Sequence, residues 1–324
     1  MNKLKSTQEL NSLIEEKTKQ RQADKRITLT VSAGTCGRAR GSEEVIAALE
    51  EQVEKKNLGD KVRIKVTGCH GFCEAEPNII LHPQDLFYQH VQPKDSDKII
   101  EETVLNEQII DKLLYAEPES GEKIEKEQDI SFYTKQKRIV LGDNVHIEPT
   151  KIDDYLSIGG YKALAKVLNN MTPEDVIAAV KDSRLRGRGG AGFPTGAKWE
   201  FTRKAKSDIK YIICNADEGD PGAYMDRSLM EGNPHRVLEG MIIGAYAIGA
   251  QEGYIYIREE YPLALHHITR AINQAEDLGL LGDNILGSGF SLKINIIKGA
   301  PSFNRQQIGV KYVTHPAAIS SFIP

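Results

Sequence analysis

A glycine- and arginine-rich stretch, Arg184–Lys198, constrains this chain more than any other feature of its sequence. It runs Arg-Leu-Arg-Gly-Arg-Gly-Gly-Ala-Gly-Phe-Pro-Thr-Gly-Ala-Lys, so that five glycines stand among three arginines and one lysine. Because glycine has no Cβ, its backbone can turn through positive φ and can approach a ligand closely. Successive backbone N–H groups in such a loop form an anion-binding concavity, to which the neighbouring cations add charge. The stretch therefore predicts a loop that holds a flat, phosphorylated ligand.

Two common phosphate-binding loops are disfavoured by the surrounding residues. Gly187, Gly189 and Gly192 have the spacing of the dinucleotide fingerprint, but that pattern needs a strand before it and a helix directly after it. The preceding segment, 173–185, has the pattern of a helix, and Pro194 disfavours a helix that begins at Gly192. A nucleotide P-loop is excluded because no Gly-Lys-Ser/Thr is present. A glycine-rich loop with a purely structural role remains the alternative.

A second motif, Cys214–Arg227, follows a short apolar run, Tyr211–Ile213, that indicates a buried strand. The motif runs Cys-Asn-Ala-Asp-Glu-Gly-Asp-Pro-Gly-Ala-Tyr-Met-Asp-Arg. Open α/β sheets bind ligands just outside the carboxyl ends of their strands. The carboxylates and the amide of this motif are therefore expected at a ligand-binding edge of the sheet.

Together the two motifs resemble those of the FMN- and NADH-binding subunit of respiratory complex I. The similarity is greatest to the relatives in NAD(P)-linked iron-only hydrogenases and formate dehydrogenases. It runs from about residue 26 to Ala300. The resemblance implies an NADH:acceptor oxidoreductase in which NAD(P)H gives a hydride to FMN, and FMN passes single electrons to iron–sulfur clusters. It also implies ferredoxin-like and iron–sulfur partner subunits in a hydrogenase, formate dehydrogenase or complex I-like assembly.

The resemblance further implies which residues form the site. Those expected to bind FMN lie in the glycine-rich stretch and in the second motif, and they are Gly187, Arg188, Gly189, Gly190, Lys198, Asn215, Asp217 and Glu218. Phe193 and Phe201 would stack on the incoming nicotinamide nucleotide. Glu218 and Asp220 are the implied catalytic acids. Asp220 stands where complex I members carry a Glu that faces the NADH ribose, and this shorter acid leaves NAD and NADP both open.

The N-terminal part has its own pattern of elements. Alternating apolar residues predict strands at 27–31 and 62–66, with a helix from Ser42 to about Lys56 between them. A hairpin at 78–91 and a helix at 96–105 follow, and the order βαββα is that of a small thioredoxin-like domain.

Three cysteines lie in loops of this domain, Cys36 after the first strand, and Cys69 and Cys73 after the second. Clustered thiolates are the ligands of iron–sulfur clusters, and the pattern resembles thioredoxin-like [2Fe-2S] ferredoxins. That family uses four cysteines, and Ser32 stands about where the fourth is expected. Two alternatives stay open: a metal site of Cys36, Cys69 and Cys73, or a domain without a cluster that serves for docking. Cys214 directly follows an apolar strand and is predicted to be a buried core thiol.

The fold class predicted is α/β, with a thioredoxin-like ferredoxin domain followed by a Rossmann-like FMN-binding α/β domain that is incomplete at its C-terminus. Alternating strands and helices in the second half predict a mostly parallel, doubly wound sheet. The first expected divisions are a polar, solvent-facing leader helix at 1–24 and the ferredoxin-type domain at 25–115. A linker at 116–132 is expected to join them to the FMN/NADH-binding domain at 133–300, whose first strand is 133–141. An aberrant tail at 301–324 follows.

Composition limits the function classes. The chain has 324 residues, 40% of them hydrophobic and 27% charged, as in a soluble globular protein. Its net charge of −4 gives no general affinity for nucleic acid. No apolar run reaches membrane-spanning length and the first residues are polar, so we expect no signal peptide, no membrane insertion and a cytoplasmic location. Cysteines in that compartment are more often metal ligands or thiols than disulfides.

The C-terminal sequence departs from the family after Ala300. The family's next loop, which holds the flavin and nicotinamide from the other side, is replaced here by an unrelated sequence up to Pro324, and a frameshift explains the change most simply. The family's ubiquitin-like domain and its [4Fe-4S]-binding helical bundle are also missing from this sequence. Losing three or four hydrogen bonds of ~1 kcal/mol each would weaken flavin binding roughly a hundredfold or more. The function alternative is therefore a non-catalytic remnant that acts only as a thioredoxin-like docking module.

Overall fold

The structure is a computed structural model that describes residues 3–189 and 191–299. Gly190 and the tail at 301–324 therefore lie outside the described residues. The chain divides into two compact units. The cysteine unit is residues 22–149, and the glycine-loop unit contains the described residues before 22 and after 149.

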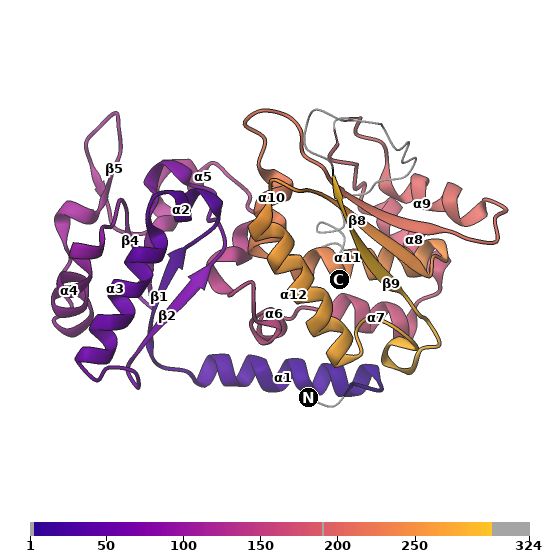
Figure 1. Ribbon diagram of the computed structural model, residues 1–324, viewed down its shortest axis with the longest axis horizontal. Coiled ribbons are helices and arrows are strands. Elements are labelled where there is room, and N and C mark those ends of the chain that lie inside the picture. Colours follow the sequence, from indigo (N-terminus) through magenta and orange to yellow (C-terminus); the bar gives the residue numbers. More distant parts are fainter. Residues whose placement is uncertain (1–2, 190, 300–324) are drawn as a thin grey trace. The chain divides into compact units, whose positions relative to one another are not determined.

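The cysteine unit is built on a four-stranded sheet in the order β2-β1-β3-β4 (Figure 1). Its larger elements are β1 (Ile27–Ser32), α2 (Thr35–Ala39), α3 (Ser42–Lys55), β2 (Val62–Thr67), β3 (Ile79–His82), β4 (Leu86–Tyr88), α4 (Ser96–Lys98) and a π-helical continuation, η3 (Ile99–Leu105). β1 pairs in parallel with β2 and antiparallel with β3. The predicted order of elements is therefore confirmed. Because β1 and β2 are parallel, the loops with the cysteines leave the sheet at the same edge.

Two apolar clusters stabilise this unit. One fills the space between the sheet and α3, and its buried members include Leu29, Val31, Val45 and Leu49. The other contains Phe72, Phe87, Ile130, Tyr133 and Val145.

The second cluster explains a difference from the sequence expectation. Residues 133–141 form no strand; the chain makes a short helix, α5 (Ser131–Thr134), which buries Tyr133 in that cluster. The guanidinium of Arg138 donates a hydrogen bond to the carbonyl of His70 at 2.7 Å.

The segment expected as a linker is also ordered and belongs to the cysteine unit. Its elements are a two-stranded hairpin, β5 (Tyr115–Ala116) and β6 (Lys123–Ile124), and the 3-10 turn η5 (Glu127–Asp129). The carboxylate of Glu117 accepts a hydrogen bond from the amide of Ser131 at 2.8 Å. Short 3-10 turns complete the unit, and they are η1 (Cys73–Ala75), η2 (Pro93–Asp95), η4 (Asp111–Leu113) and η6 (Gly142–His146).

The glycine-loop unit contains a parallel sheet in the order β7-β8-β9. Its elements are α6 (Ile152–Ser157), α7 (Lys162–Asn170), α8 (Pro173–Asp182), α9 (Thr195–Lys204), β7 (Tyr211–Ala216), α10 (Met225–Gly232), α11 (Pro234–Ile248), β8 (Glu252–Arg258), α12 (Pro262–Leu278), η7 (Ile285–Gly287) and β9 (Lys293–Gly299). α11 is buried along almost its whole length and contacts β7 and β8 (Figure 1). The predicted alternation of strands and helices and the parallel pairing are both present.

A buried carboxylate links α11 to α6 and to the start of α7. Glu239 accepts hydrogen bonds from the Tyr155 hydroxyl at 2.5 Å, from the Tyr161 amide at 2.9 Å and from the Leu164 amide at 3.1 Å. The three donors compensate the carboxylate for the loss of water. Tyr161 has a positive φ of 64°, and the bond to its amide holds this unusual backbone in place.

The helix expected at the start of the chain is present as α1 (Thr7–Ala23), but it does not face solvent on all sides. Leu10 and Ile14 are fully buried. Lys17 forms an ion pair with Asp153 at 2.9 Å. The apolar residues at helical spacing therefore form a packing face within the glycine-loop unit.

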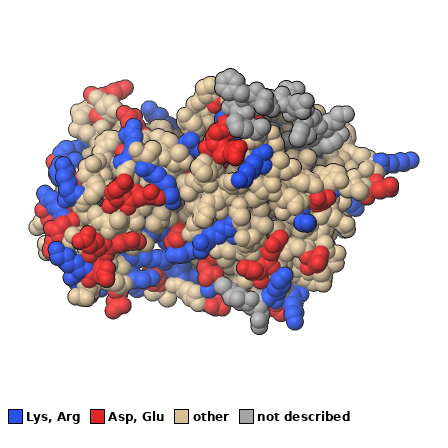
Figure 2. All heavy atoms as spheres, in the orientation of Figure 1, with Lys and Arg blue, Asp and Glu red and all other residues tan. Residues whose placement is uncertain are grey.

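Charged side chains of both signs are interspersed on the face seen in Figure 2. Within the described ranges, no helix is long and apolar enough to cross a membrane.

Candidate functional site

The glycine loop is closed at its base by backbone hydrogen bonds. Arg186 and Pro194 form an antiparallel bridge, and the amide of Gly187 donates to the carbonyl of Phe193 at 2.9 Å. The Arg186 guanidinium also donates to the carbonyl of Gly192 at 3.0 Å. The loop follows helix α8, and α9 begins only after Pro194. An ordinary dinucleotide-binding turn is therefore absent from this stretch, as predicted.

The tip of the loop is accessible. Arg188 and Gly189 are exposed, and a Cβ placed on Gly189 would meet no atom within 4 Å. Gly192 has a positive φ of 61°, a conformation that glycine adopts without strain. The backbone at the tip can therefore be approached closely by a ligand.

Three predicted ligand-binding side chains lie beside this loop. Phe193 and Phe201 are 43% and 59% exposed, although large apolar rings are usually buried. Their ring centroids are 6.4 Å apart, and the ammonium of Lys198 lies 6.0 Å from the Phe193 ring centroid. Partial burial lowers the pKa of Lys198. The structure thus brings together two exposed rings and a cation.

Gly196, in the same stretch, has a packing role. A Cβ there would lie 2.7 Å from the backbone nitrogen and 2.9 Å from the Cα of Lys181. The absence of a side chain lets α9 cross close to α8, and these contacts fix where the loop between the two helices leaves them.

The second predicted motif begins at the carboxyl end of β7. Asn215 is exposed, and its side-chain oxygen accepts a hydrogen bond from the amide of Asp217 at 3.1 Å. Asp217 lies 3.9 Å from the guanidinium of Arg258. Asp220 is exposed in the turn that follows.

The side-chain carboxylate of Glu218 lies at the N-terminus of α10. Its carboxylate accepts hydrogen bonds from the amides of Met225 at 2.8 Å and Asp226 at 3.2 Å. A carboxylate is favourable there because it pairs amides that have no partner within the helix and complements the helix dipole. The local role of Glu218 is therefore that of a helix cap, and its assignment as a catalytic acid stays a prediction.

Two residues that the sequence analysis did not assign to the site hold this turn from the other side. Arg258 and Tyr261 both donate to the backbone carbonyl of Glu218, at 2.9 and 3.2 Å. Arg258 is the last residue of β8, which pairs in parallel with β7. Ligands bind outside the carboxyl ends of the strands in open α/β sheets. The same rule, applied to β8, would have predicted Arg258 as a site residue.

Both parts of the site are attached to α11. A Cβ on Gly244 of α11 would lie 3.0 Å from the ring of Trp199 in α9 and 3.3 Å from Ile212 in β7. Gly244 therefore allows the helix after the glycine loop and the strand before the second motif to pack on neighbouring parts of one helix.

Three of the cysteines lie in the cysteine unit. Cys69 is buried and Cys73 is exposed, and the neighbouring Cys73 thiol together with burial raises the pKa of Cys69. Cys36 lies in α2, at the same edge of the sheet. Across residues 3–189 and 191–299, no three His, Cys, Asp or Glu side chains lie close enough together to hold a metal ion. The assignment of Cys36, Cys69 and Cys73 as metal ligands stays a prediction.

The position expected for a fourth ligand is occupied by a polar pair. The hydroxyl of Ser32 donates a hydrogen bond to the carboxylate of Glu76, and both residues are buried. Burial raises the pKa of Glu76 from 4.5 to about 7. Sequence analysis did not identify Glu76. Cys214 is buried as predicted, and burial raises the pKa of its thiol.

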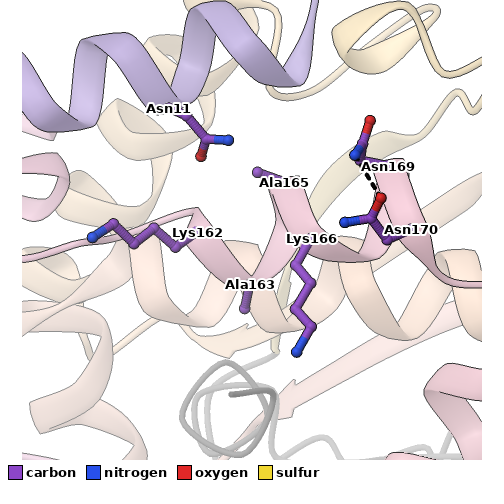
Figure 3. A pocket seen from close by; sticks show the side chains of 7 residues that line it. All are labelled: Asn11, Lys162, Ala163, Ala165, Lys166, Asn169 and Asn170. Atoms are coloured by element: carbon purple, nitrogen blue, oxygen red, sulfur yellow. Dashed lines mark hydrogen bonds between the residues drawn. The ribbon is translucent and has the colours of Figure 1, made fainter.

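A pocket of about 330 Å³ lies between α1 and α7 (Figure 3). Asn11 faces it from α1, and Asn169 donates a hydrogen bond to Asn170 at 2.6 Å on the opposite side. None of the residues that line it belongs to the predicted site.

Part of the chain that contains this site is similar to a known family of proteins. Residues 180–310 match the family model described as the Nuo51 FMN-binding domain. This segment contains the glycine loop, the second motif, and both Arg258 and Tyr261.

Particular relatives agree with the family model. The chain is 55% identical over 169 residues to NADP-reducing hydrogenase subunit HndC of Solidesulfovibrio fructosivorans, a match that covers 52% of this chain and 34% of that protein. It is 50% identical over 152 residues to an NADH-quinone oxidoreductase subunit of Rhizobium meliloti (strain 1021), covering 47% of this chain and 36% of that protein. The chain thus spans about a third of the length of the curated relatives it matches.

Solved structures are also similar to the chain. An NAD+-reducing [NiFe]-hydrogenase in the H2-reduced state matches with a TM-score of 0.44 and 19% identity, over 98% of this chain and 58% of that chain. The wild-type thioredoxin-like [2Fe-2S] ferredoxin from Aquifex aeolicus matches with a TM-score of 0.27 and 24% identity, over 29% of this chain and 99% of that chain.

Proposed function

We propose that this chain is part of a flavoprotein NAD(P)H dehydrogenase whose glycine-loop unit, a Rossmann-like α/β domain, binds FMN and exchanges hydride with NAD(P)H. The observation that carries the proposal is the match of residues 180–310 to the Nuo51 FMN-binding domain. It is supported by the attachment of both sequence motifs to α11. The names of the relatives, an NADP-reducing hydrogenase subunit and an NADH-quinone oxidoreductase subunit, support a reaction with nicotinamide nucleotides.

The residues of the site have the chemistry that FMN requires. The open backbone at Gly189 would admit a phosphate group beside Gly187, and Arg188 and Lys198 would balance its charge. Gly190 belongs to the same proposal. When bound, FMN supplies hydride and single-electron chemistry that no side chain here possesses.

The second motif would hold the rest of the flavin. The exposed amide of Asn215 and the carboxylate of Asp217 would bond its polar groups, and Glu218 would keep the turn rigid by capping α10. Phe193 and Phe201 would stack on the nicotinamide nucleotide. Their exposure supports this role, because a bound ring would cover apolar surface that now faces water.

The acid at Asp220 would face the ribose of that nucleotide. Iron–sulfur subunits of a hydrogenase, formate dehydrogenase or complex I-like assembly would then accept the electrons. The cysteine unit would dock on them as a thioredoxin-like domain, which its βαββα order supports. A [2Fe-2S] cluster on Cys36, Cys69 and Cys73 remains an alternative for this unit, although no group of three such side chains that could hold a metal ion is found among the described residues.

The test is an FMN titration of the anaerobically purified chain, followed by flavin fluorescence, and then addition of NADH. We expect fluorescence quenching by the chain and bleaching of the flavin absorption by NADH. Gly189→Ala should weaken FMN binding about tenfold, since it obstructs roughly one hydrogen bond of ~1 kcal/mol.

Gly59→Ala is the matched control. A Cβ at Gly59 would also meet no atom within 4 Å, but Gly59 lies in the cysteine unit, away from the glycine loop in the chain. The proposal fails if excess FMN leaves flavin fluorescence unchanged, or if Gly189→Ala binds FMN as tightly as Gly59→Ala does.

A further inference from the structure

The turn after β7 is anchored through the backbone carbonyl of Glu218. The guanidinium of Arg258 donates to this oxygen at 2.9 Å, and the hydroxyl of Tyr261 donates to it at 3.2 Å. A carbonyl oxygen has two lone pairs, so two donors satisfy it fully. A hydrogen bond from a charged donor is roughly twice as strong as one between neutral groups, and Arg258 is therefore expected to supply the larger part of the anchor.

The side chain of Glu218 anchors the same turn in a second direction. Its carboxylate accepts the amides of Met225 at 2.8 Å and Asp226 at 3.2 Å, at the start of α10. Arg258 is the last residue of β8, and Tyr261 directly precedes α12. Glu218 therefore connects α10 with the end of β8 and the start of α12, and a change in its backbone conformation would also disturb the cap of α10.

The ring of Tyr261 is held by two guanidinium groups. The Cζ atoms of Arg258 and Arg227 lie 5.4 and 5.6 Å from its centroid, and Arg227 also lies 4.1 Å from the ring centroid of Tyr224. A guanidinium within about 6 Å of an aromatic centroid is attracted to the ring, most strongly where water is excluded. Tyr261 is buried. Because Arg227 belongs to the first turn of α10, this stack fixes the Tyr261 hydroxyl relative to the helix that Glu218 caps.

These bonds decide which groups of the second motif can meet a ligand. The side-chain oxygen of Asn215 accepts the amide of Asp217 at 3.1 Å, so its NH2 group is the part that would donate to a ligand. Glu218 uses both its carboxylate and its carbonyl within the protein. The guanidinium of Arg258 lies 3.9 Å from the Asp217 carboxylate, and its charge reduces the repulsion between this carboxylate and a phosphorylated ligand.

We propose that Arg258 and Tyr261 are positioning residues of the flavin site. Acting through Glu218, they hold the turn in the conformation in which Asn215 and Asp217 meet FMN. The inference rests on the proposed function of the glycine-loop unit and adds to it two residues that lie outside both sequence motifs. Their contribution to affinity is preorganisation, because a turn that is already fixed does not have to be ordered when the ligand binds.

The first measurement needs no flavin. Hydrogen exchange of the full-length chain is followed by mass spectrometry in a peptide that contains Met225 and Asp226. Arg258→Met keeps a long apolar side chain but removes the donor, and it should speed exchange in this peptide about tenfold because the cap from Glu218 loosens. Arg270→Met is the matched control. Arg270 also donates to a backbone carbonyl in the same unit, that of Thr150 at 2.9 Å, and its loss should leave the peptide unchanged.

The second measurement is an FMN titration of the same chains, followed by flavin fluorescence. Arg258→Met should raise the dissociation constant about tenfold, and Tyr261→Phe, which removes only the hydroxyl, about fivefold. Arg258→Lys keeps the charge and one donor, and it should recover part of the loss. Arg270→Met should bind FMN as the wild type does. If Arg258→Met does not fold, as judged by Trp199 fluorescence, Arg258→Lys and Tyr261→Phe replace it in both measurements.

The outcomes separate this inference from the proposed function. If the wild type binds FMN and Arg258→Met binds it equally tightly, the positioning role is overturned and the flavin function stands. Equal losses of affinity in Arg258→Met and Arg270→Met indicate a general effect on stability, and they overturn the positioning role as well. So does exchange at the wild-type rate in the α10 peptide of Arg258→Met. A wild-type chain that binds no FMN overturns the proposed function and this inference with it.

Discussion

Glu76 illustrates how burial changes a carboxyl group that looks ordinary in the sequence. It is 1% exposed and bonded to Ser32 and to the amide of Asn78, and burial outweighs these bonds, raising its pKa to about 7. Folding therefore favours the protonated form. The stability that this group contributes is fully present below pH 4.5 and is lost as the pH rises through about 7.

We expect the free energy of unfolding of the cysteine unit to fall by about 3 kcal/mol over this interval because of Glu76. Glu76→Gln removes the titration and should flatten that part of the profile. Hydrogen exchange of the β1 amides at several pH values, corrected for intrinsic rates, measures the difference. Parallel profiles for the wild type and Glu76→Gln would refute the assignment.

Gly196 gives a second prediction at this scale. Gly196→Ala should lower the free energy of unfolding by about 1–3 kcal/mol, because its Cβ meets the backbone of Lys181, which cannot rotate away as a side chain would. Urea unfolding followed by the fluorescence of Trp199, the single tryptophan of the chain, measures it. Gly189→Ala should unfold like the wild type; equal losses in both variants would contradict the packing role.

At the scale of elements, the residues that begin helix α8 can be recognised in the sequence. Thr172 precedes Pro173, and its side chain accepts the amide of Asp175 at 3.2 Å while the Asp175 carboxylate accepts the amide of Thr172 at 2.9 Å. This reciprocal capping fixes the start of the helix that leads into the glycine loop.

Thr172→Ala should therefore lower the free energy of unfolding of the glycine-loop unit by about 1 kcal/mol. Thr172→Ser, which keeps the hydroxyl, is the control and should lose much less. The Trp199 fluorescence in urea again serves as the measurement, since α9 packs on α8. Equal stability of Thr172→Ala and the wild type would show that tertiary packing alone fixes this helix end.

At the scale of the whole molecule, the two compact units can be followed separately. Trp199 fluorescence reports on the glycine-loop unit, and exchange of the β1 amides reports on the cysteine unit. A ligand that binds only the native state stabilises the unit that binds it. With FMN at about a hundred times its dissociation constant, the free energy of unfolding reported by Trp199 should rise by about 2.7 kcal/mol. Exchange of the β1 amides in the cysteine unit should not change. A rise in β1 protection without a change at Trp199 would place the flavin in the cysteine unit instead.

Sequence patterns predicted most of the elements because those signals are local. The alternation at 27–31, the helix start at Thr172 and the apolar run before Cys214 each depend on a few neighbouring residues, and each matches the structure. The prediction of a strand at 133–141 was wrong, since Tyr133 packs in a cluster with Phe72 and Phe87, which are distant in sequence.

The sequence by itself determined the motifs, the order of strands and helices and the chemistry available at the glycine loop, because these follow from residue types and short spacings. Tertiary structure alone decided that Arg258 and Tyr261 hold the carbonyl of Glu218, and that Ser32 bonds to Glu76. Contacts of this kind depend on how strands and loops far apart in the chain meet at one edge of a sheet, and no local pattern encodes them.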